Sequence, residues 1–121
     1  MRDPTRGGLM GVLHDLAEAT RAEVWLDAGL VPVREDVKAA CEMLGLDPCD
    51  TVNEGKMVIA AAADQADAAL AQLRAHPLGK DAAIIGKLRP AARGEGMVVA
   101  LRQGSEELVI RREGKVFPRL C

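Results

Sequence analysis

Aromatic side chains are almost missing from this chain of 121 residues, which has one Trp, one Phe and no Tyr. Proteins that hold single-stranded nucleic acid usually stack its bases on aromatic side chains, so the composition argues against that class. A concentrated basic face is lacking as well, because 16 Lys and Arg residues are interspersed with 18 Asp and Glu residues and the net charge is −2. Binding to a phosphate backbone requires such a face. We therefore expect no nucleic-acid partner.

Metal-binding patterns and membrane segments are also lacking. The three cysteines, Cys41, Cys49 and Cys121, form no CxxC pair, and neither His14 nor His76 lies at ligand spacing from them. We expect no metal site, and Cys41, on the apolar stripe of a predicted helix, should be a small buried hydrophobic residue. No apolar run reaches the roughly 18 residues of a membrane span, and no secretory signal is visible. These features predict a cytoplasmic domain with reduced thiols and no membrane contact.

Small aliphatic residues supply most of the hydrophobic content, which suits helices packed closely on a sheet. Apolar residues at helical spacing predict helices at about 8–19, 34–44 and 64–75. Apolar runs and alternation predict strands at 22–26, 57–62, 82–88, 97–101 and 108–111, the last two around the turn at 103–105. We expect an α+β two-layer sandwich over residues 1–114, with three helices on one face of a mixed, mainly antiparallel sheet.

Four local features follow from the same patterns. Asp3 or Thr5 is expected to cap the first helix, and Asp64 to cap the third. The continuous apolar run at 57–62 predicts a central strand covered on both faces. Gly11 inside the first helix costs on the order of 1 kcal/mol relative to Ala, which suggests close packing at that point.

The first candidate site is the motif that ends in Arg6, Gly7 and Gly8, directly before a predicted helix. Glycines there let backbone N–H groups approach an anion, and the helix dipole favours negative charge. The Arg6 guanidinium adds a fork for phosphate or carboxylate. The alternative is an ordinary capped turn, and no Gly-Lys-Ser/Thr follows as in a Walker loop.

A second motif, Asn53-Glu54-Gly55-Lys56, stands where a loop enters the run at 57–62. Gly55 would let the backbone turn sharply. Glu54 is then a carboxylate at a strand end, where functional residues gather, and it is either a general base or a solvated loop charge. Neither alternative is decided by the motif alone.

A third candidate is the last residue, Cys121. Chain ends are poorly ordered unless tied down, so a thiol there can move between sites as a carrier. The alternative is a surface cysteine without a role. The terminal carboxylate opposes thiolate formation, whereas Arg119 offsets it. We expect residues 115–121 to form a mobile tail that must dock into a site to become reactive.

Several motifs in this order resemble the C-terminal half of the HypE family of hydrogenase expression/formation proteins. They are Asp-Pro-Thr-Arg-Gly-Gly-Leu at 3–9, Cys-Glu-Met-Leu-Gly-Leu-Asp-Pro at 41–48, Asn-Glu-Gly-Lys at 53–56, His-Pro-Leu-Gly-Lys-Asp-Ala-Ala-Ile-Ile-Gly at 76–86 and Pro-Arg-Leu-Cys at 118–121. The family belongs to a superfamily that resembles aminoimidazole ribonucleotide synthetase and selenophosphate synthetase. A purine-pathway synthetase fits less well, because such enzymes need no terminal cysteine.

The resemblance implies an ATP-dependent carbamoyl dehydratase. A HypF-like carbamoyltransferase would load the terminal thiol, here Cys121, and ATP would activate the carbamoyl oxygen. Loss of phosphate would leave a thiocyanate, and its cyanide would pass to iron on a HypC–HypD complex as a ligand of NiFe-hydrogenase. Glu54 matches the proton acceptor proposed in the family. Arg6, Gly7, Gly8 and Asn53 would shape the phosphate and substrate end.

Family members are more than twice as long as this chain. The resemblance implies that their N-terminal half supplies most of the ATP and Mg²⁺ site and the homodimer contact. We therefore expect the 121 residues to fold but neither to hydrolyse ATP nor to dehydrate a carbamoyl group alone. The alternative is a non-catalytic docking module that only recruits maturation partners.

Overall fold

The computed structural model describes residues 1–92 and 96–110. Its helices are α1 (Gly8–Thr20), α2 (Glu35–Leu44) and α3 (Ala66–Arg74), with short 3-10 turns η1 (Ala28–Leu30) and η2 (Pro77–Gly79). Its strands are β1 (Glu23–Asp27), β2 (Gly86–Arg89), β3 (Val98–Arg102) and β4 (Ser105–Val109). The predicted tail at 115–121 lies outside the described residues.

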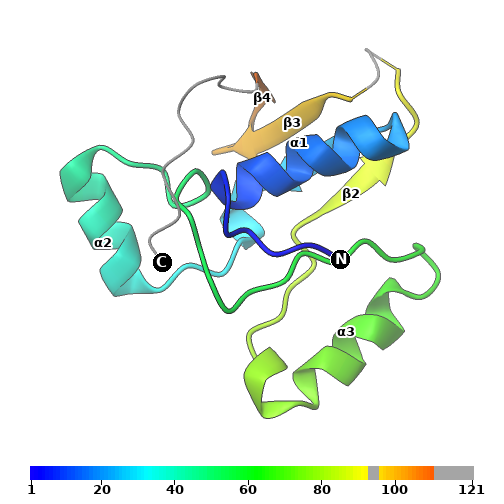
Figure 1. Cartoon of the computed structure of the whole chain (residues 1–121), viewed down its shortest axis with the longest axis horizontal. Helices are drawn as coiled ribbons and strands as arrows, with labels where there is room; N and C mark the ends of the chain where they lie inside the picture. The colour runs from blue at the N-terminus through cyan, green and yellow to red at the C-terminus, as the bar shows by residue number, and fades with distance from the viewer. Residues whose placement is uncertain (93–95, 111–121) are drawn as a thin grey trace.

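The strands form one sheet in the order β2-β1-β3-β4. Figure 1 shows α1 lying in front of this sheet, with β2, β3 and β4 labelled. β1 pairs antiparallel with β2 and parallel with β3, while β3 pairs antiparallel with β4. The central parallel pair is the buried one, as parallel strands usually are, and Val24 and Val98 face each other in it. The expected α+β fold with a mixed, mainly antiparallel sheet is confirmed.

The predicted hairpin between β3 and β4 is also present. Arg102 pairs with Ser105, so the loop consists of Gln103 and Gly104 alone. Both have positive φ, 49° and 80°, as a type I′ turn requires. Because this turn matches the twist of the strands, it fixes the register of β4.

Helix α1 covers the central strands and forms the core with them. Met10, Leu13 and Ala17 of α1 are buried against apolar side chains of β1 and β3. The apolar face predicted for the first helix is therefore confirmed. Its predicted caps are wrong, because the N-cap is Gly7 without a side-chain bond, and the Thr5 hydroxyl donates to the Asp3 carboxylate instead.

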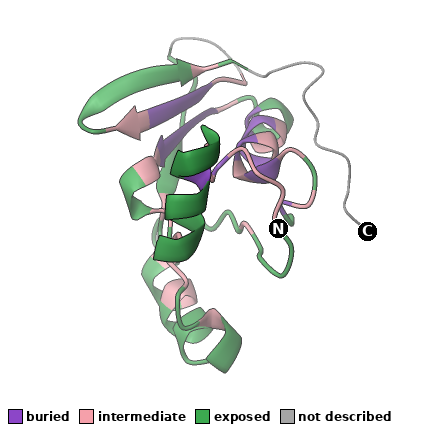
Figure 2. Cartoon of the chain, turned by 90° about the vertical axis from the view of Figure 1, so that its left-hand side faces the viewer, coloured by how far each residue is buried: buried purple, intermediate pink, exposed green. Residues whose placement is uncertain are grey.

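Helices α2 and α3 contribute much less to the core and are largely exposed (Figure 2). Cys41 is the buried residue of α2, as expected, and Gly45 ends that helix with a φ of 67°. No residue of α3 is buried. Asp64 does not cap α3, because the helix begins at Ala66, two residues later than predicted, and Gln65 takes the N-cap position.

The apolar run at 57–62 is not a central strand, and this prediction is wrong. The centre of the sheet is occupied by β1 and β3. Residues 57–62 lie beside the first residues of the chain instead, joined to them by a bridge between Arg2 and Val58. Met57 is 56% exposed and Ile59 is 40% exposed. The strand predicted at 82–88 is shorter and begins later, because β2 covers Gly86–Arg89.

Candidate functional site

Two motifs from distant parts of the sequence lie side by side near the start of α1. The backbone N–H of Asn53 donates to the carbonyl oxygen of Pro4 at 3.0 Å. Arg2 and Val58 exchange both backbone bonds, at 3.0 and 2.8 Å. The segments 1–4 and 53–58 therefore run antiparallel, and the loop that carries Glu54 is held against the segment that leads to Arg6.

The glycines of the first motif are required by local packing. Gly7 and Gly8 have φ values of 69° and 63°, which L side chains rarely adopt. A Cβ on Gly8 would lie 2.6 Å from the carbonyl oxygen of Thr51 and 2.7 Å from that of Cys49. Gly8 thus lets the turn that precedes the Glu54 loop approach the start of α1. This contact supports the ordinary-turn interpretation of the glycines, and their predicted role in phosphate binding remains a prediction.

The first N–H groups of α1 are partly used within the protein. Met10 N–H donates to the carbonyl oxygen of Cys49 at 3.1 Å, so this donor is not available to an anion. Gly11 has the close neighbour that we expected, since a Cβ there would lie 3.0 Å from the Arg6 carbonyl oxygen. The start of α1 is therefore a packed junction, and any anion binding there depends more on side chains than on the helix end.

Charged and polar side chains line a depression next to this junction. Its volume is about 330 Å³, and it is bounded by Arg2, Asp3, Thr5 and Arg6. Thr5 Oγ1 donates to Asp3 Oδ2 at 2.9 Å, and Arg2 pairs with Asp15 of α1 at 2.5 Å. The Arg6 side chain is exposed and can reach an anionic group that enters this depression.

The Asn53-Glu54-Gly55-Lys56 loop turns sharply, as predicted. Gly55 has a φ of 71° and no atom within 4 Å of an added Cβ. Lys56 Nζ donates to Asn53 Oδ1 at 2.7 Å and closes the loop across its tip. Glu54 sits at that tip and is exposed, so its carboxylate is accessible to a reacting group. The amide oxygen of Asn53 is already used by Lys56, which leaves the side-chain N–H₂ to contact a substrate.

The turn beneath this loop is fixed by residues that the sequence did not reveal as a group. Asp47 Oδ1 accepts the Cys49 N–H at 2.8 Å, and the Asp47 carboxylate pairs with Arg102 at the end of β3. Cys49 is buried, and this burial, aided by the Asp47 carboxylate, raises the pKa of its thiol to about 12. Cys49 is therefore a protonated core thiol. The Asp47-Pro48 pair indicates a turn, but nothing in the sequence indicates its ion pair with a strand far along the chain.

Other candidate groups are placed as follows. Cys121 lies outside the described residues, so its role remains a prediction. Within residues 1–92 and 96–110, no cluster of three or more His, Cys, Asp or Glu side chains is arranged to hold a metal ion. None of the helices in those ranges is long and apolar enough to cross a membrane.

Taken together, the described part of the site combines a guanidinium, an accessible carboxylate and an amide on two adjoining segments. Such a set can bind a negatively charged or carbonyl-containing group and accept a proton from it.

Known proteins resemble this chain over its full length. A carbamoyl dehydratase HypE from Bradyrhizobium diazoefficiens is 44% identical over 121 residues, and one from Rhizobium leguminosarum bv. viciae is 41% identical. These matches cover 100% of this chain but 35% and 34% of the relatives. The chain thus spans about a third of the length of the curated relatives it matches.

Solved structures of HypE proteins have the same fold as this chain. A crystal structure of the hydrogenase maturation protein HypE has a TM-score of 0.91 at 41% identity, covering 99% of this chain and 39% of that chain. A HypE structure in complex with ATP has a TM-score of 0.90 at 39% identity, with 99% and 37% covered. A HypE–HypF complex gives a TM-score of 0.83 at 36% identity, with 92% and 35% covered.

The resemblance to HypE that the motifs indicated is therefore confirmed for the sequence and for the fold. Residues 1–99 match the family of AIR synthase related proteins, C-terminal domain. This match includes both motifs of the candidate site and all of α1, β1 and β2. The chain belongs to the AIR synthase related protein, C-terminal domain family.

Proposed function

We propose that this chain is the part of a HypE-type carbamoyl dehydratase that carries the acceptor thiol and the proton acceptor. The observation that carries this proposal is the bond between Asn53 and Pro4, which holds the Glu54 loop beside the Arg6 segment. Similarity to proteins named carbamoyl dehydratase HypE supplies the reaction. The polypeptide that those relatives have in addition would complete the active site.

In the proposed reaction, the Cys121 thiol accepts a carbamoyl group from a HypF-type carbamoyltransferase and becomes a thiocarbamate. ATP then phosphorylates the carbamoyl oxygen, because phosphate leaves readily whereas an amide oxygen does not. One of the two nitrogen protons is lost as the oxygen is phosphorylated, Glu54 takes the remaining one as phosphate departs, and a thiocyanate remains on sulfur. Two electrons from a reductant on the HypC–HypD side would then cleave the S–C bond, so that cyanide passes to iron on the HypC–HypD complex and the Cys121 thiolate is regenerated.

The described residues fit one end of a nucleotide better than a metal. Arg6 brings a guanidinium group to the depression, where it would hold a phosphate, whereas the Arg2 guanidinium is paired with Asp15. No carboxylate cluster that would hold Mg²⁺ occurs in residues 1–92 and 96–110. ATP and Mg²⁺ would thus be held mainly by the polypeptide outside this chain, which would also provide the homodimer contact. The 121 residues alone should not turn over ATP.

Mass spectrometry tests the proposal directly. The chain is incubated with a HypF-type carbamoyltransferase, carbamoyl phosphate and ATP, and the peptide that contains Cys121 is analysed. We expect a gain of one carbamoyl group that is absent in Cys121→Ala. Binding to the carbamoyltransferase without any modification would contradict the proposal and would support a docking module instead. The solved HypE–HypF complex shows that a HypE protein binds HypF, so this second outcome is a real alternative.

A further inference from the structure

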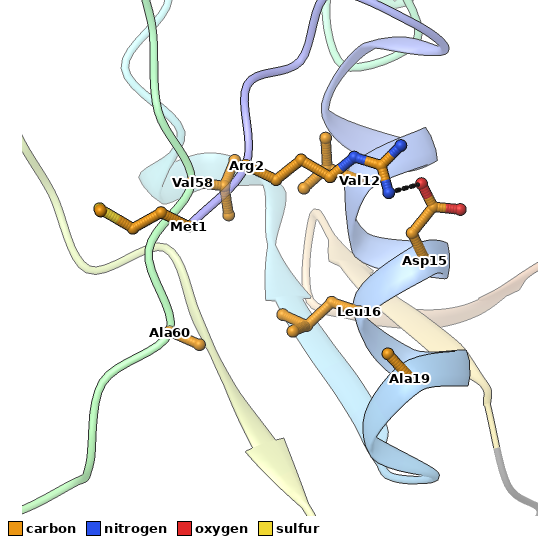
Figure 3. A pocket seen from close by; sticks show the side chains of 8 residues that line it. All are labelled: Met1, Arg2, Val12, Asp15, Leu16, Ala19, Val58 and Ala60. Atoms are coloured by element: carbon orange, nitrogen blue, oxygen red, sulfur yellow. Dashed lines mark ion pairs between the residues drawn. The ribbon is translucent and has the colours of Figure 1, made fainter.

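Val58 and Ala60, from the apolar run at 57–62, form one wall of a groove. The opposite wall is α1, and the groove has a volume of about 190 Å³ (Figure 3). Its lining is mostly apolar and includes Met1, Val12, Leu16, Ala19, Val58 and Ala60. The ion pair between Arg2 and Asp15 fixes one end of the groove to α1.

The backbone along this wall is set up for a strand. Arg2 and Val58 exchange two backbone bonds, which is the hydrogen-bonded pair of an antiparallel ladder. Such pairs recur at every second residue, so the next ones along the run belong to Ala60 and then Ala62. In the ranges 1–92 and 96–110, no backbone bond joins Ala60 to another segment. The ladder therefore consists of the Arg2–Val58 pair, and no segment among the described residues extends it to Ala60.

We propose that this groove seats an extended segment from the part of the HypE-type polypeptide that this chain does not cover. The segment would continue the line from Arg2 through Met1, run antiparallel to 59–62 and exchange backbone bonds with Ala60. Its groove-facing side chains would be apolar, because Leu16, Ala19 and Val58 line the groove. An unpaired edge next to an apolar groove is the usual seat of an added strand.

Two observations favour this occupant over a second copy of the chain. The relatives match this chain over its full length yet contain about twice as much additional polypeptide, since 34–35% of their length is covered. The groove also begins at the bridge that residues of the chain already form, so a strand in the same line extends an existing ladder. The inference needs the family membership but not the carbamoyl chemistry.

Residue-resolved hydrogen exchange tests the proposal by comparing two proteins. One is this chain, and the other is the full-length HypE of Bradyrhizobium diazoefficiens at the positions matched to Ala60 and Ala62. We expect these amides to exchange at least 100-fold more slowly in the full-length protein than in this chain. Equal exchange in both proteins would overturn the proposal. Slow exchange of the Ala60 and Ala62 amides in the 121-residue chain, together with a dimer in sedimentation equilibrium, would also overturn the proposal, because a second copy would then be the occupant.

Two neighbouring proline substitutions sharpen the test in the full-length protein. Ala60→Pro removes the N–H that faces the proposed strand, whereas Ala61→Pro removes one that faces the other way. We expect the first to abolish the slow exchange at position 62 and the second to leave it. Core amides of β1 and β3 report whether each variant folds. Equal loss of protection in two folded variants would contradict the assigned register.

Discussion

The Asn53 N–H donates to the Pro4 carbonyl oxygen at 3.0 Å, and this bond joins the two motifs of the candidate site. It sets the loop with Glu54 beside the segment with Arg6. Gly8 makes the approach possible, because a side chain there would collide with the backbone at 49–51. The candidate site thus depends on backbone packing as much as on its charged side chains.

Gly8→Ala should therefore destabilise the chain more than Gly55→Ala. Both glycines have positive φ, which costs about 1–2 kcal/mol for an L side chain. Only Gly8 faces backbone oxygens within 2.7 Å of an added Cβ, so its substitution should cost about 1–3 kcal/mol more. Urea unfolding at 25 °C measures the difference. Equal losses from the two variants would show that the Gly8 contact is not tight.

The ion pair between Asp47 and Arg102 should stabilise the turn beneath the Glu54 loop. Its side chains are 22% and 37% exposed, whereas the pair between Asp36 and Arg34 is 63% and 80% exposed. Asp47→Ala should lower the free energy of unfolding by about 1.5–3 kcal/mol, because it removes bonds to Arg102 and to the Cys49 N–H. Asp36→Ala is the matched control and should cost much less, because it loses an exposed pair and a charge in the first turn of α2. A loss in the control as large as that in Asp47→Ala would contradict this account.

The buried Cys49 thiol should make stability fall at high pH. Its pKa is raised from the ordinary 9.0 to about 12, first by burial and then by Asp47. Between these values the unfolded chain loses the proton while the folded chain keeps it, so the free energy of unfolding decreases as pH rises. Below pH 9 both states are protonated and the thiol has no effect. Urea unfolding between pH 8 and 11 measures this effect. The free energy of unfolding of Cys49→Ala should fall less steeply with pH than that of the unchanged chain. Equal slopes in the two proteins would contradict the prediction.

Local patterns predicted the elements that depend on neighbouring residues. The apolar spacing of α1, the Gly45 stop of α2 and the Gln103-Gly104 turn each arise within a few positions, and all are present. The prediction for the run at 57–62 was wrong because local composition does not show which segments lie next to it in space. Its composition fits a central strand, but its neighbours in space decide whether it is covered, and β1 and β3 occupy the centre instead.

In the candidate site as well, local features were predictable from the sequence and contacts between distant segments were not. Its residue types were identifiable as two motifs, whereas their contact through Asn53 and Pro4 required the fold. Long-range polar contacts were not predictable at all. One is the bond from the Ala92 N–H to the buried Glu23 carboxylate at 3.0 Å. Such contacts depend on strand register, which one sequence does not specify.

Arg6 should matter for the ATP-dependent step rather than for loading of the thiol. The test uses a chimera in which this chain replaces the matching third of the Bradyrhizobium HypE. Arg6→Ala should slow dehydration at least tenfold and leave carbamoylation unchanged, because the guanidinium faces the depression proposed for phosphate. Arg34→Ala, at the start of α2, is the control and should affect neither step. If Arg6→Ala dehydrates at the normal rate, the phosphate lies elsewhere.

The most direct measurement follows the species on Cys121 in the same chimera carrying Glu54→Gln. The amide keeps the size of the side chain but cannot accept the proton. After addition of the carbamoyltransferase, carbamoyl phosphate and ATP, mass spectrometry should find the thiocarbamate accumulated on Cys121 and no thiocyanate. Thiocyanate formed at the rate of the unchanged chimera, or a carbamoyl group on a residue other than Cys121, would contradict the account.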